Sequence, residues 1–412
     1  MGDLAADCTV TQDELSACNH TDAPASGYRL RQSPEKKEAF DKVNDLRQFI
    51  RLLSEQGRLV RVCEATDWKF EIGRMTRARQ RPLLFENIKG YPGQRVFTNG
   101  LCDTASIALA LGMNPASTRA TLIKEAKERI RKPVKPVLVH ASPVFENVIL
   151  ATKVNLLQLP VPHWSEHDGG RYLGTWHINV TKDPATGSRN VGVYRMQLLD
   201  EKHATISASP RSHLAQHLAQ AEKDGRPLPM AVAIGVSEAV MMAAAAAYPA
   251  GIDEYELAGA LCQRPLSLLQ CQTVNLEIPA NSEIVIEGLI QPGVRVQDGP
   301  YFDYTGNPNT NPNAFLFEAT GLMFRSNPIF RGAAIGVPGA EDHQLFAFLS
   351  ELGLVDFHGS RIKQAVQDIL LQQHLFRAFQ LAGRLAGGVA EMFRGSRKSS
   401  SVGRNAARHG IS

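Results

Sequence analysis

The sequence predicts a mixed fold, α/β and α+β, with an N-terminal α/β domain, a strand-rich middle and a mostly helical C-terminal part. Three observations lead to this prediction. An amphipathic helix pattern precedes two short strand patterns, strand patterns then dominate the middle, and helical periodicity follows residue 343. Many short strands with one or two inserted helices favour a barrel or split barrel for the middle.

The first two segments differ in composition. Residues 1–43 are polar with little apolar periodicity, so we expect a flexible extension. Residues 44–145 form the N-terminal α/β domain. In this domain a helix is expected to begin near Asn44 and to end at Gly57. The strands LVRV and PLLFEN and a short apolar helix, TASIALALGM, follow it.

The central domain, residues 146–342, contains a predicted hairpin in which Arg195 lies mid-strand. A helix is expected with Ser209 as N-cap and Pro210 at its first position. Further on, a buried strand, MAVAIGV, precedes an Ala-rich helix capped by Ser237, and we expect no membrane span there. Residues 307–313, NPNTNPN, are expected to be a turn-rich linker.

The C-terminal part divides into a helical segment, 343–384, and a basic tail, 385–412, that we expect to be disordered. With 412 residues, 43% of them apolar and a net charge of +4, the chain is typical of a globular protein and does not favour nucleic-acid binding. Its six cysteines lack a CxxC pattern, which favours reduced thiols. The N-terminus lacks the features of a signal peptide, so we expect a cytoplasmic location.

The segment QDGPYFDYTG places two carboxylates, Asp298 and Asp303, around a Gly-Pro turn, and Arg195 lies in the run NVGVYRMQL upstream. Such a trio suits chemistry on a carboxylic acid, because an arginine binds a carboxylate as a fork. An acid beside the arginine stays ionised, whereas an acid in an apolar pocket holds its proton. By spacing alone, a surface salt bridge and a turn-capping aspartate explain the same residues.

The chain resembles the UbiD family of decarboxylases over about residues 44–345. The resemblance rests on many ordered segments, including DLRQFIRLLSEQGRLVRV, LLFENIKGYPG, RNVGVYRMQ, LEIPANSEIVIEGLI, DGPYFDYTG and PIFRGAAIG. It implies a central flavin-binding split β-barrel that uses prenylated FMN. The implied reaction is the reversible, non-oxidative decarboxylation of an α,β-unsaturated, aromatic or heteroaromatic carboxylic acid.

The resemblance also implies residue roles. Arg195 would pair with Asp298, and Asp303 would handle the proton. A metal ion, Mn²⁺ or Mg²⁺, would hold the flavin phosphate, with K⁺ as a further ion. Its ligands would be Asn190, His213 and Glu254, whose oxygen and nitrogen donors suit manganese. The implied cofactor-binding set is Asn190, Val193, Tyr194, Arg195, Ser212, His213 and Glu254.

Each implied ligand also has an ordinary explanation, as a turn asparagine, an exposed histidine or an acid that starts a helix. Because Asn190 and Arg195 are an odd number of residues apart, one cofactor can touch both only if the strand bulges near Gly192 or the cofactor wraps an edge. Both acids are Asp where many relatives carry Glu. The C-terminal part is shorter than in typical members.

The implied partners are a flavin prenyltransferase as cofactor supplier and further copies of the chain in a homo-oligomer. Two other functions stay open. The shorter C-terminal part fits a non-catalytic or partner-dependent subunit of a carboxylase or decarboxylase assembly. Barrel architecture alone fits a binder of ordinary FMN, similar to flavin reductases.

Overall fold

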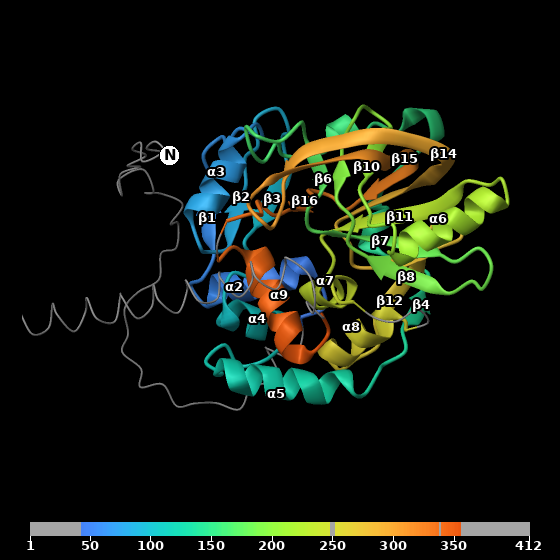
Figure 1. Ribbon diagram of the computed structural model, residues 1–412. Coiled ribbons are helices and arrows are strands. Elements are labelled where there is room, and N and C mark those ends of the chain that lie inside the picture. Colours follow the sequence, from blue (N-terminus) through green and yellow to red (C-terminus); the bar gives the residue numbers. More distant parts are fainter. Residues whose placement is uncertain (1–42, 248–251, 338, 356–412) are drawn as a thin grey trace, which may run out of the picture.

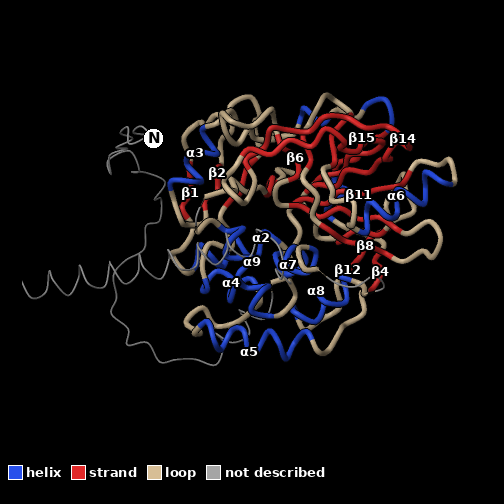
Figure 2. The backbone as a smooth tube through the Cα atoms, viewed as in Figure 1, coloured by secondary structure: helices blue, strands red, loops and turns tan. Residues whose placement is uncertain are grey.

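The computed structural model describes residues 43–247, 252–337 and 339–355. The predicted extension up to residue 42, the helical segment beyond residue 355 and the basic tail lie outside the described residues. In the described part, strands and helices segregate, with most helices gathered on one side of the sheets (Figures 1 and 2). The predicted mixture of helix and sheet is confirmed.

Helix α2 (Leu46–Glu55) opens the described chain because its apolar residues recur on one face. Asp45 accepts a hydrogen bond from the backbone N–H of Gln48 and so caps the first turn. Gly57 follows with a φ of 63°, a left-handed conformation that suits glycine after a helix. The expected helix between Asn44 and Gly57 is confirmed.

A four-stranded sheet combines strands from distant parts of the chain. Its order is β1 (Val60–Val62), β2 (Leu83–Phe85), β3 (Arg95–Thr98) and β16 (Ile329–Arg331). The late strand β16 runs parallel to β3. This pairing ties Arg331, and the chain leading to helix α9 (Glu341–Leu352), to the N-terminal sheet.

The central sheet has seven strands and curls until its two edges approach each other (Figure 1). Its path runs through β10 (His203–Ile206), β15 (Pro308–Phe324), β14 (Ile284–Phe302), β11 (Leu228–Ile234), β7 (His177–Lys182) and β8 (Arg189–Gly192), and β5 (Asn147–Leu150) also pairs with β15. Beyond the edge strand β8, Arg195 forms a bridge to Ser207, next to the other edge strand, β10. The expected barrel-like middle is therefore a curled sheet, and the split barrel stays a prediction.

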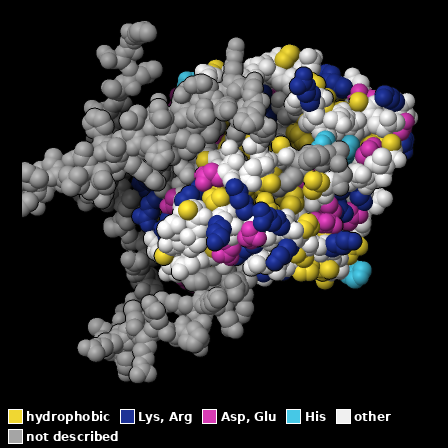
Figure 3. All heavy atoms as spheres, turned by 60° about the horizontal axis from the view of Figure 1, so that its bottom comes forward, with side chains coloured by type: hydrophobic (Ala, Val, Ile, Leu, Met, Phe, Trp, Pro, Cys, Tyr) yellow, Lys and Arg dark blue, Asp and Glu magenta, His cyan; other side chains and the backbone are white. Residues whose placement is uncertain are grey.

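Two small sheets and the remaining helices surround this frame. One sheet joins β13 (Glu277–Pro279), β12 (Ser267–Gln270) and β4 (Val137–Val139), and the other joins β6 (Tyr172–Gly174) and β9 (Met196–Gln197). The helices are α3 (Glu71–Ala78), α4 (Thr104–Ala110), α5 (Arg119–Ile130), α6 (His213–Lys223), α7 (Glu238–Ala244) and α8 (Glu254–Cys262). The face turned forward in Figure 3 mixes basic and acidic side chains. None of the described helices is long and apolar enough to cross a membrane.

Several details differ from the sequence predictions. Residues 308–313 are not a linker, because they pair with β14 in a long hairpin, and pairing overrides the weak strand propensity of Asn and Pro. Helix α6 begins at His213 rather than at Pro210, because Ser212, not Ser209, caps it through the N–H of Ala215. Ser237 occupies the N-cap of α7 but makes no capping hydrogen bond.

Arg195 is not mid-strand. Strand β8 ends at Gly192, and three residues separate it from β9. Gly192 lets the ring of Tyr194 lie close to the backbone here, because a Cβ at position 192 would lie 2.7 Å from that ring. The two-residue alternation therefore stops at Gly192, which removes the objection that Asn190 and Arg195 must face opposite ways.

Candidate active site

A cavity of about 520 Å³, here called the central cavity, lies between the curled sheet and helices α7 and α9. The sheet side contributes Arg195 and Tyr301, and α9 contributes Asp342 and Phe346. Val193 also lines it. Its volume falls in the range of small-molecule sites, and apolar residues with a few polar groups are the usual lining of such sites.

Arg195 and Asp298 form an ion pair in the wall of the central cavity. Arg195 Nε lies 2.6 Å from Asp298 Oδ1, and Nη2 contacts the same oxygen. The Asp298 side chain is fully buried, and its Oδ2 accepts a hydrogen bond of 2.6 Å from the Thr205 hydroxyl. Among the described residues, Arg195 Nη1 has no partner, so an anion in the cavity can bind there.

Asp303 lies at the turn of the β14–β15 hairpin and lines the central cavity. Its carboxylate accepts hydrogen bonds from the Thr305 N–H at 2.9 Å and from the Asn309 amide at 3.2 Å. The next residue, Tyr304, packs against Phe346 of α9 with ring centroids 5.7 Å apart. Arg195 and Asp303 thus line one cavity, and Asp298 is buried behind Arg195 as its ion-pair partner.

A second cavity of about 380 Å³, here called the side cavity, lies between β8 and α6. Asn190 and His213 both line it, and His213 is the first residue of α6, where free backbone N–H groups favour a phosphate. Glu254 lies behind β8 and accepts a hydrogen bond of 3.1 Å from the N–H of Val191. Burial raises the pKa of Glu254 to about 7.

The three predicted metal ligands therefore lie on adjoining elements. In the described part of the chain, no group of three His, Cys, Asp or Glu residues is arranged to hold a metal ion. The predicted set differs from such a group because Asn190 would contribute an amide oxygen. A divalent cation bound by Glu254 would offset the free-energy cost of burying its ionised carboxylate. The residues present thus fit a metal, although Glu254 does not line the side cavity.

Tyr194 lies between the two cavities and connects the predicted cofactor residues. Burial raises the pKa of its hydroxyl, and hydrogen bonds from the Asn190 side chain and the Leu214 N–H oppose this shift. The distance from Asn190 Nδ2 to the Tyr194 oxygen is 3.4 Å. Ser212, predicted to touch the cofactor, caps α6 and donates to the Ser209 carbonyl at 2.7 Å. The interruption after β8 thus runs from one cavity to the other.

Sequence reasoning missed a buried network behind the central cavity. Arg331 binds Glu238 through Nε at 2.8 Å and Glu341 through Nη1 at 3.0 Å. Glu238 also accepts a hydrogen bond of 2.9 Å from Trp176, which lines the cavity. Burial raises the pKa of Glu238, and the charge of Arg331 opposes this. The spacing of Arg331 and Glu341 across a loop gave no sequence signal for this pairing.

Glu287, in strand β14, is a buried acid away from the Arg195–Asp298 pair. Its buried carboxylate accepts hydrogen bonds from the backbone N–H groups of Gln272 and Thr273. The six cysteines include four in the described part, Cys63, Cys102, Cys262 and Cys271, and none of these forms a disulfide.

An arginine paired with a buried aspartate, beside a cavity that a second aspartate lines, can bind a small carboxylate and exchange a proton with it. Two family models identify the class of protein. A 3-octaprenyl-4-hydroxybenzoate carboxy-lyase N-terminal domain matches residues 50–126, and the Rift-related domain of the same carboxy-lyase matches residues 136–338. The chain belongs to the UbiD family, as the sequence resemblance predicted.

Known proteins resemble this chain over about three quarters of its length. The pyrrole-2-carboxylic acid decarboxylase of Pseudomonas aeruginosa is 34% identical over 76% of the chain and 66% of the relative. A phenolic acid decarboxylase of Sedimentibacter hydroxybenzoicus is 33% identical over 75% of the chain and 67% of the relative. The chain spans about two thirds of the length of the curated relatives it matches.

Solved structures also resemble this chain over about three quarters of its length. The vanillic acid decarboxylase of Sedimentibacter hydroxybenzoicus in its closed form superposes with a TM-score of 0.71, at 33% identity over 73% of this chain and 66% of that one. An evolved dimeric form of the UbiD-class enzyme HmfF from Pelotomaculum thermopropionicum, in complex with prenylated FMN, gives 0.70, at 34% identity over 75% of this chain and 71% of that one.

Proposed function

We propose that the protein is a prenylated-FMN-dependent carboxy-lyase that decarboxylates an aromatic, heteroaromatic or α,β-unsaturated acid. The observation that carries this proposal is the Arg195–Asp298 pair in the wall of a cavity of about 520 Å³ that Asp303 also lines. Family membership and relatives named as decarboxylases of pyrrole-2-carboxylic and phenolic acids support it. Because decarboxylation is microscopically reversible, carboxylation by the same site is part of the proposal.

The chain's own residues divide the work. Arg195 binds the substrate carboxylate and holds it in one orientation, since Asp298 fixes the guanidinium and Thr205 in turn holds Asp298. Asp303 delivers a proton to the carbon that loses carbon dioxide. When bound, prenylated FMN supplies the electron sink for this chemistry.

The two cavities suggest how the cofactor is held. The flavin ring would lie in the central cavity beside Val193 and Arg195, with its phosphate toward the side cavity. Asn190, His213 and Glu254 would hold a divalent metal, Mn²⁺ or Mg²⁺, at that phosphate, with K⁺ as a further ion. Tyr194 and Ser212 would support them from the β8–β9 interruption and the α6 cap.

The wider setting is part of the same proposal. A flavin prenyltransferase would supply the cofactor, the chain would assemble as a homo-oligomer, and it would act in the cytoplasm. A partner-dependent subunit is the alternative, and restoration of turnover by a co-purifying protein would distinguish it.

The decisive experiment is expression with an active flavin prenyltransferase, followed by mass spectrometry of the bound flavin and by turnover of a panel of aromatic acids. Asp303→Asn should keep the flavin yet lose deuterium exchange at the substrate carbon, about 10²–10⁴-fold. Asp224→Asn, an exposed residue paired with Arg226, is the control and should exchange normally. Wild-type exchange rates in Asp303→Asn would exclude Asp303 as the proton donor.

The metal set is tested separately. His213→Ala should lower both divalent metal and flavin content, measured by elemental analysis and absorbance. His203→Ala, a partly exposed histidine paired with Asp200, should change neither. Full occupancy of metal and flavin in His213→Ala would refute the ligand assignment.

A further inference from the structure

Asp342, in the first turn of α9, is a buried carboxylate for which the described part of the chain provides no well-formed hydrogen bond. The residue is 4% exposed and lines the central cavity. Neither side-chain oxygen has a hydrogen-bond partner of good geometry among the described residues. The backbone N–H groups of Gly336 and His343 lie near enough to lower the pKa of Asp342 in part, against the effect of burial. Since buried polar groups are nearly always bonded in native proteins, such an exception requires an explanation.

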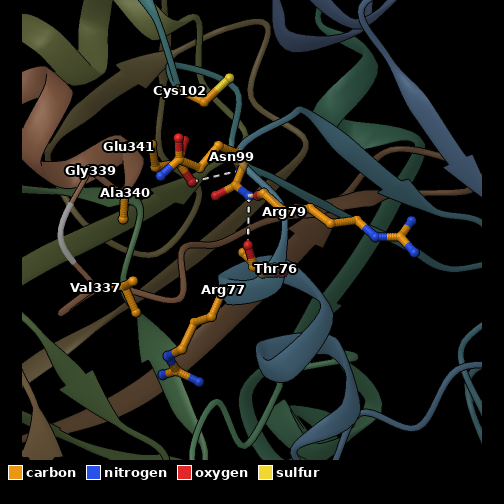
Figure 4. A pocket seen from close by; sticks show the side chains of 10 residues that line it. Thr76, Arg77, Arg79, Asn99, Cys102, Val337, Gly339, Ala340 and Glu341 are labelled. Atoms are coloured by element: carbon orange, nitrogen blue, oxygen red, sulfur yellow. Dashed lines mark hydrogen bonds between the residues drawn. The ribbon is translucent and has the colours of Figure 1, made fainter. Parts of the chain in front are cut away.

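The first turn of α9, which contains Asp342, is anchored through the neighbouring residue Glu341. Glu341 binds Arg331 at 3.0 Å, and it accepts a hydrogen bond of 2.8 Å from the N–H of Asn99. Asn99 in turn donates to the Thr76 carbonyl, as Figure 4 shows. The pocket beside these residues is only about 10 Å³, which holds about one water molecule and no organic ligand.

The neighbouring residue does not satisfy Asp342 either. His343 Nε2 lies 3.8 Å from Asp342 Oδ2, beyond hydrogen-bond distance, and contacts the Tyr304 carbonyl at 2.7 Å. Burial raises the pKa of Asp342 to about 6, and the charge of His343 opposes this shift. Because the His343 ring contacts the Tyr304 carbonyl, a donor group that enters the central cavity can bind the Asp342 oxygens.

The other acids near the cavity differ from Asp342. Asp298 is bonded to Arg195 and Thr205, and Asp303 is bonded to Thr305 and Asn309. Among the described cavity residues, Asp342 is thus the carboxylate whose two oxygens both lack a well-formed protein hydrogen bond. It lies on α9, whereas Arg195 lies on the sheet side, so a ligand between them meets both a cation and an acceptor.

We propose that Asp342 is a specificity residue that accepts a hydrogen bond from a hydroxyl or N–H group on the ring of the acid whose carboxylate binds Arg195. The identity of that ligand as an acid rests on the proposed function. A site with a buried acceptor discriminates strongly against an analogue without the donor, because the acceptor is then left unpaired. The protein would therefore select hydroxylated or N–H-bearing ring acids over their isosteres.

The test compares two pairs of acids that differ in the ring donor. Pyrrole-2-carboxylate is matched with furan-2-carboxylate, and 4-hydroxybenzoate with 4-fluorobenzoate. Binding to the flavin-loaded protein is measured by calorimetry at pH 7.5, so no turnover is required. Wild type should bind a donor-bearing acid on the order of tenfold more tightly than its isostere. Asp342→Leu should abolish this preference, and Asp342→Asn, a nearly isosteric change that preserves folding, should reduce it several-fold.

The control is Glu351→Gln, an exposed residue on the same helix that pairs with Arg119, and it should keep the preference. Equal affinities for both members of each pair in wild type, or an unchanged preference in both Asp342 variants, would overturn the proposal. Weaker flavin binding with the acid preference intact would also overturn it, by assigning Asp342 to the cofactor. A clear preference without decarboxylation of any acid would instead reject the proposed function and leave this inference standing.

Discussion

The central cavity has two unlike walls, each with a buried aspartate. On the sheet side, Asp298 is bonded to Arg195 and Thr205. On the α9 side, Asp342 is equally buried but has no hydrogen-bond partner among the described residues. Protein groups thus satisfy the aspartate on the sheet side, whereas the aspartate on the α9 side has oxygens left for a ligand. The Arg195–Asp298 pair is therefore a preorganised binding group.

The two walls also differ in how the chain builds them. Asp298 lies in the long β14–β15 hairpin, between register shifts on either side of it, and such irregularities re-aim a side chain within a sheet. Asp342 follows a loop and is held through its neighbour Glu341, which binds Arg331 at the end of β16. One wall is thus fixed by local pairing and the other by contacts distant in sequence.

The largest change in stability should follow removal of Arg195 from the Arg195–Asp298 pair on the sheet side. Arg195→Ala leaves Asp298 buried with only Thr205 as partner, so the free energy of unfolding should fall by about 3–5 kcal/mol. Urea unfolding at pH 7.5 measures this change. Arg211→Ala, an exposed arginine in the loop before α6, is the control and should change stability by less than about 0.5 kcal/mol.

A double variant sharpens the result. If the cost in Arg195→Ala is the unpaired charge, Arg195→Ala with Asp298→Ala should be more stable than Arg195→Ala alone. Equal or lower stability of the double variant would mean that Arg195 stabilises the fold by packing on Tyr301, whose ring centroid lies 5.3 Å away, rather than by neutralising Asp298.

Removing the charge of Asp342, on the α9 side of the cavity, should raise the free energy of unfolding rather than lower it. Asp342→Asn should raise the free energy of unfolding by about 2–3 kcal/mol above pH 7, because the pKa of Asp342 is raised from 3.8 to about 6 by burial. Between about pH 4 and 6 the folded state binds more protons than the unfolded state, so wild type loses stability as pH rises through this window. The asparagine variant lacks this loss.

Urea unfolding at pH 4 and pH 8 checks the sign. The two proteins should differ little at pH 4 and most at pH 8. A stability gain that is the same at both pH values would show that ionisation of Asp342 is not its cause. Glu351→Gln provides the control, since that carboxyl is about half exposed.

The sequence predicted the elements that depend on local patterns and missed those that depend on distant pairing. Local apolar patterns in the sequence predict helix α2 and strand β11, and the structure has both elements where these patterns lie. Residues 308–313 look like a linker locally, yet the facing strand β14 makes them a strand. Ser212 rather than Ser209 caps α6, a choice that local propensity does not distinguish.

The candidate site divides in the same way. Arg195, Asp298 and Asp303 stand out because a family resemblance supplies them, and the structure places them around one cavity. Asp342 and Trp176 had no sequence signal, because their positions follow from the packing of α9 and from the Glu238–Arg331–Glu341 contacts. Glu341 and Asp342 are adjacent acids in the sequence, yet one is paired and the other is not.

The smallest change in stability should follow substitution of Thr205, whose hydroxyl is bonded to Asp298. Its hydroxyl donates to Asp298 Oδ2 at 2.6 Å and accepts a hydrogen bond of 3.0 Å from the N–H of Gln197. Thr205→Val keeps the shape but leaves both partners unsatisfied, so the free energy of unfolding should fall by about 1–3 kcal/mol. This loss should be smaller than that of Arg195→Ala, because Asp298 keeps its counter-ion. Thermal and urea unfolding, with flavin content recorded in parallel, measure it. A loss as large as that of Arg195→Ala would mean that the hydroxyl, not the guanidinium, is the main partner of Asp298.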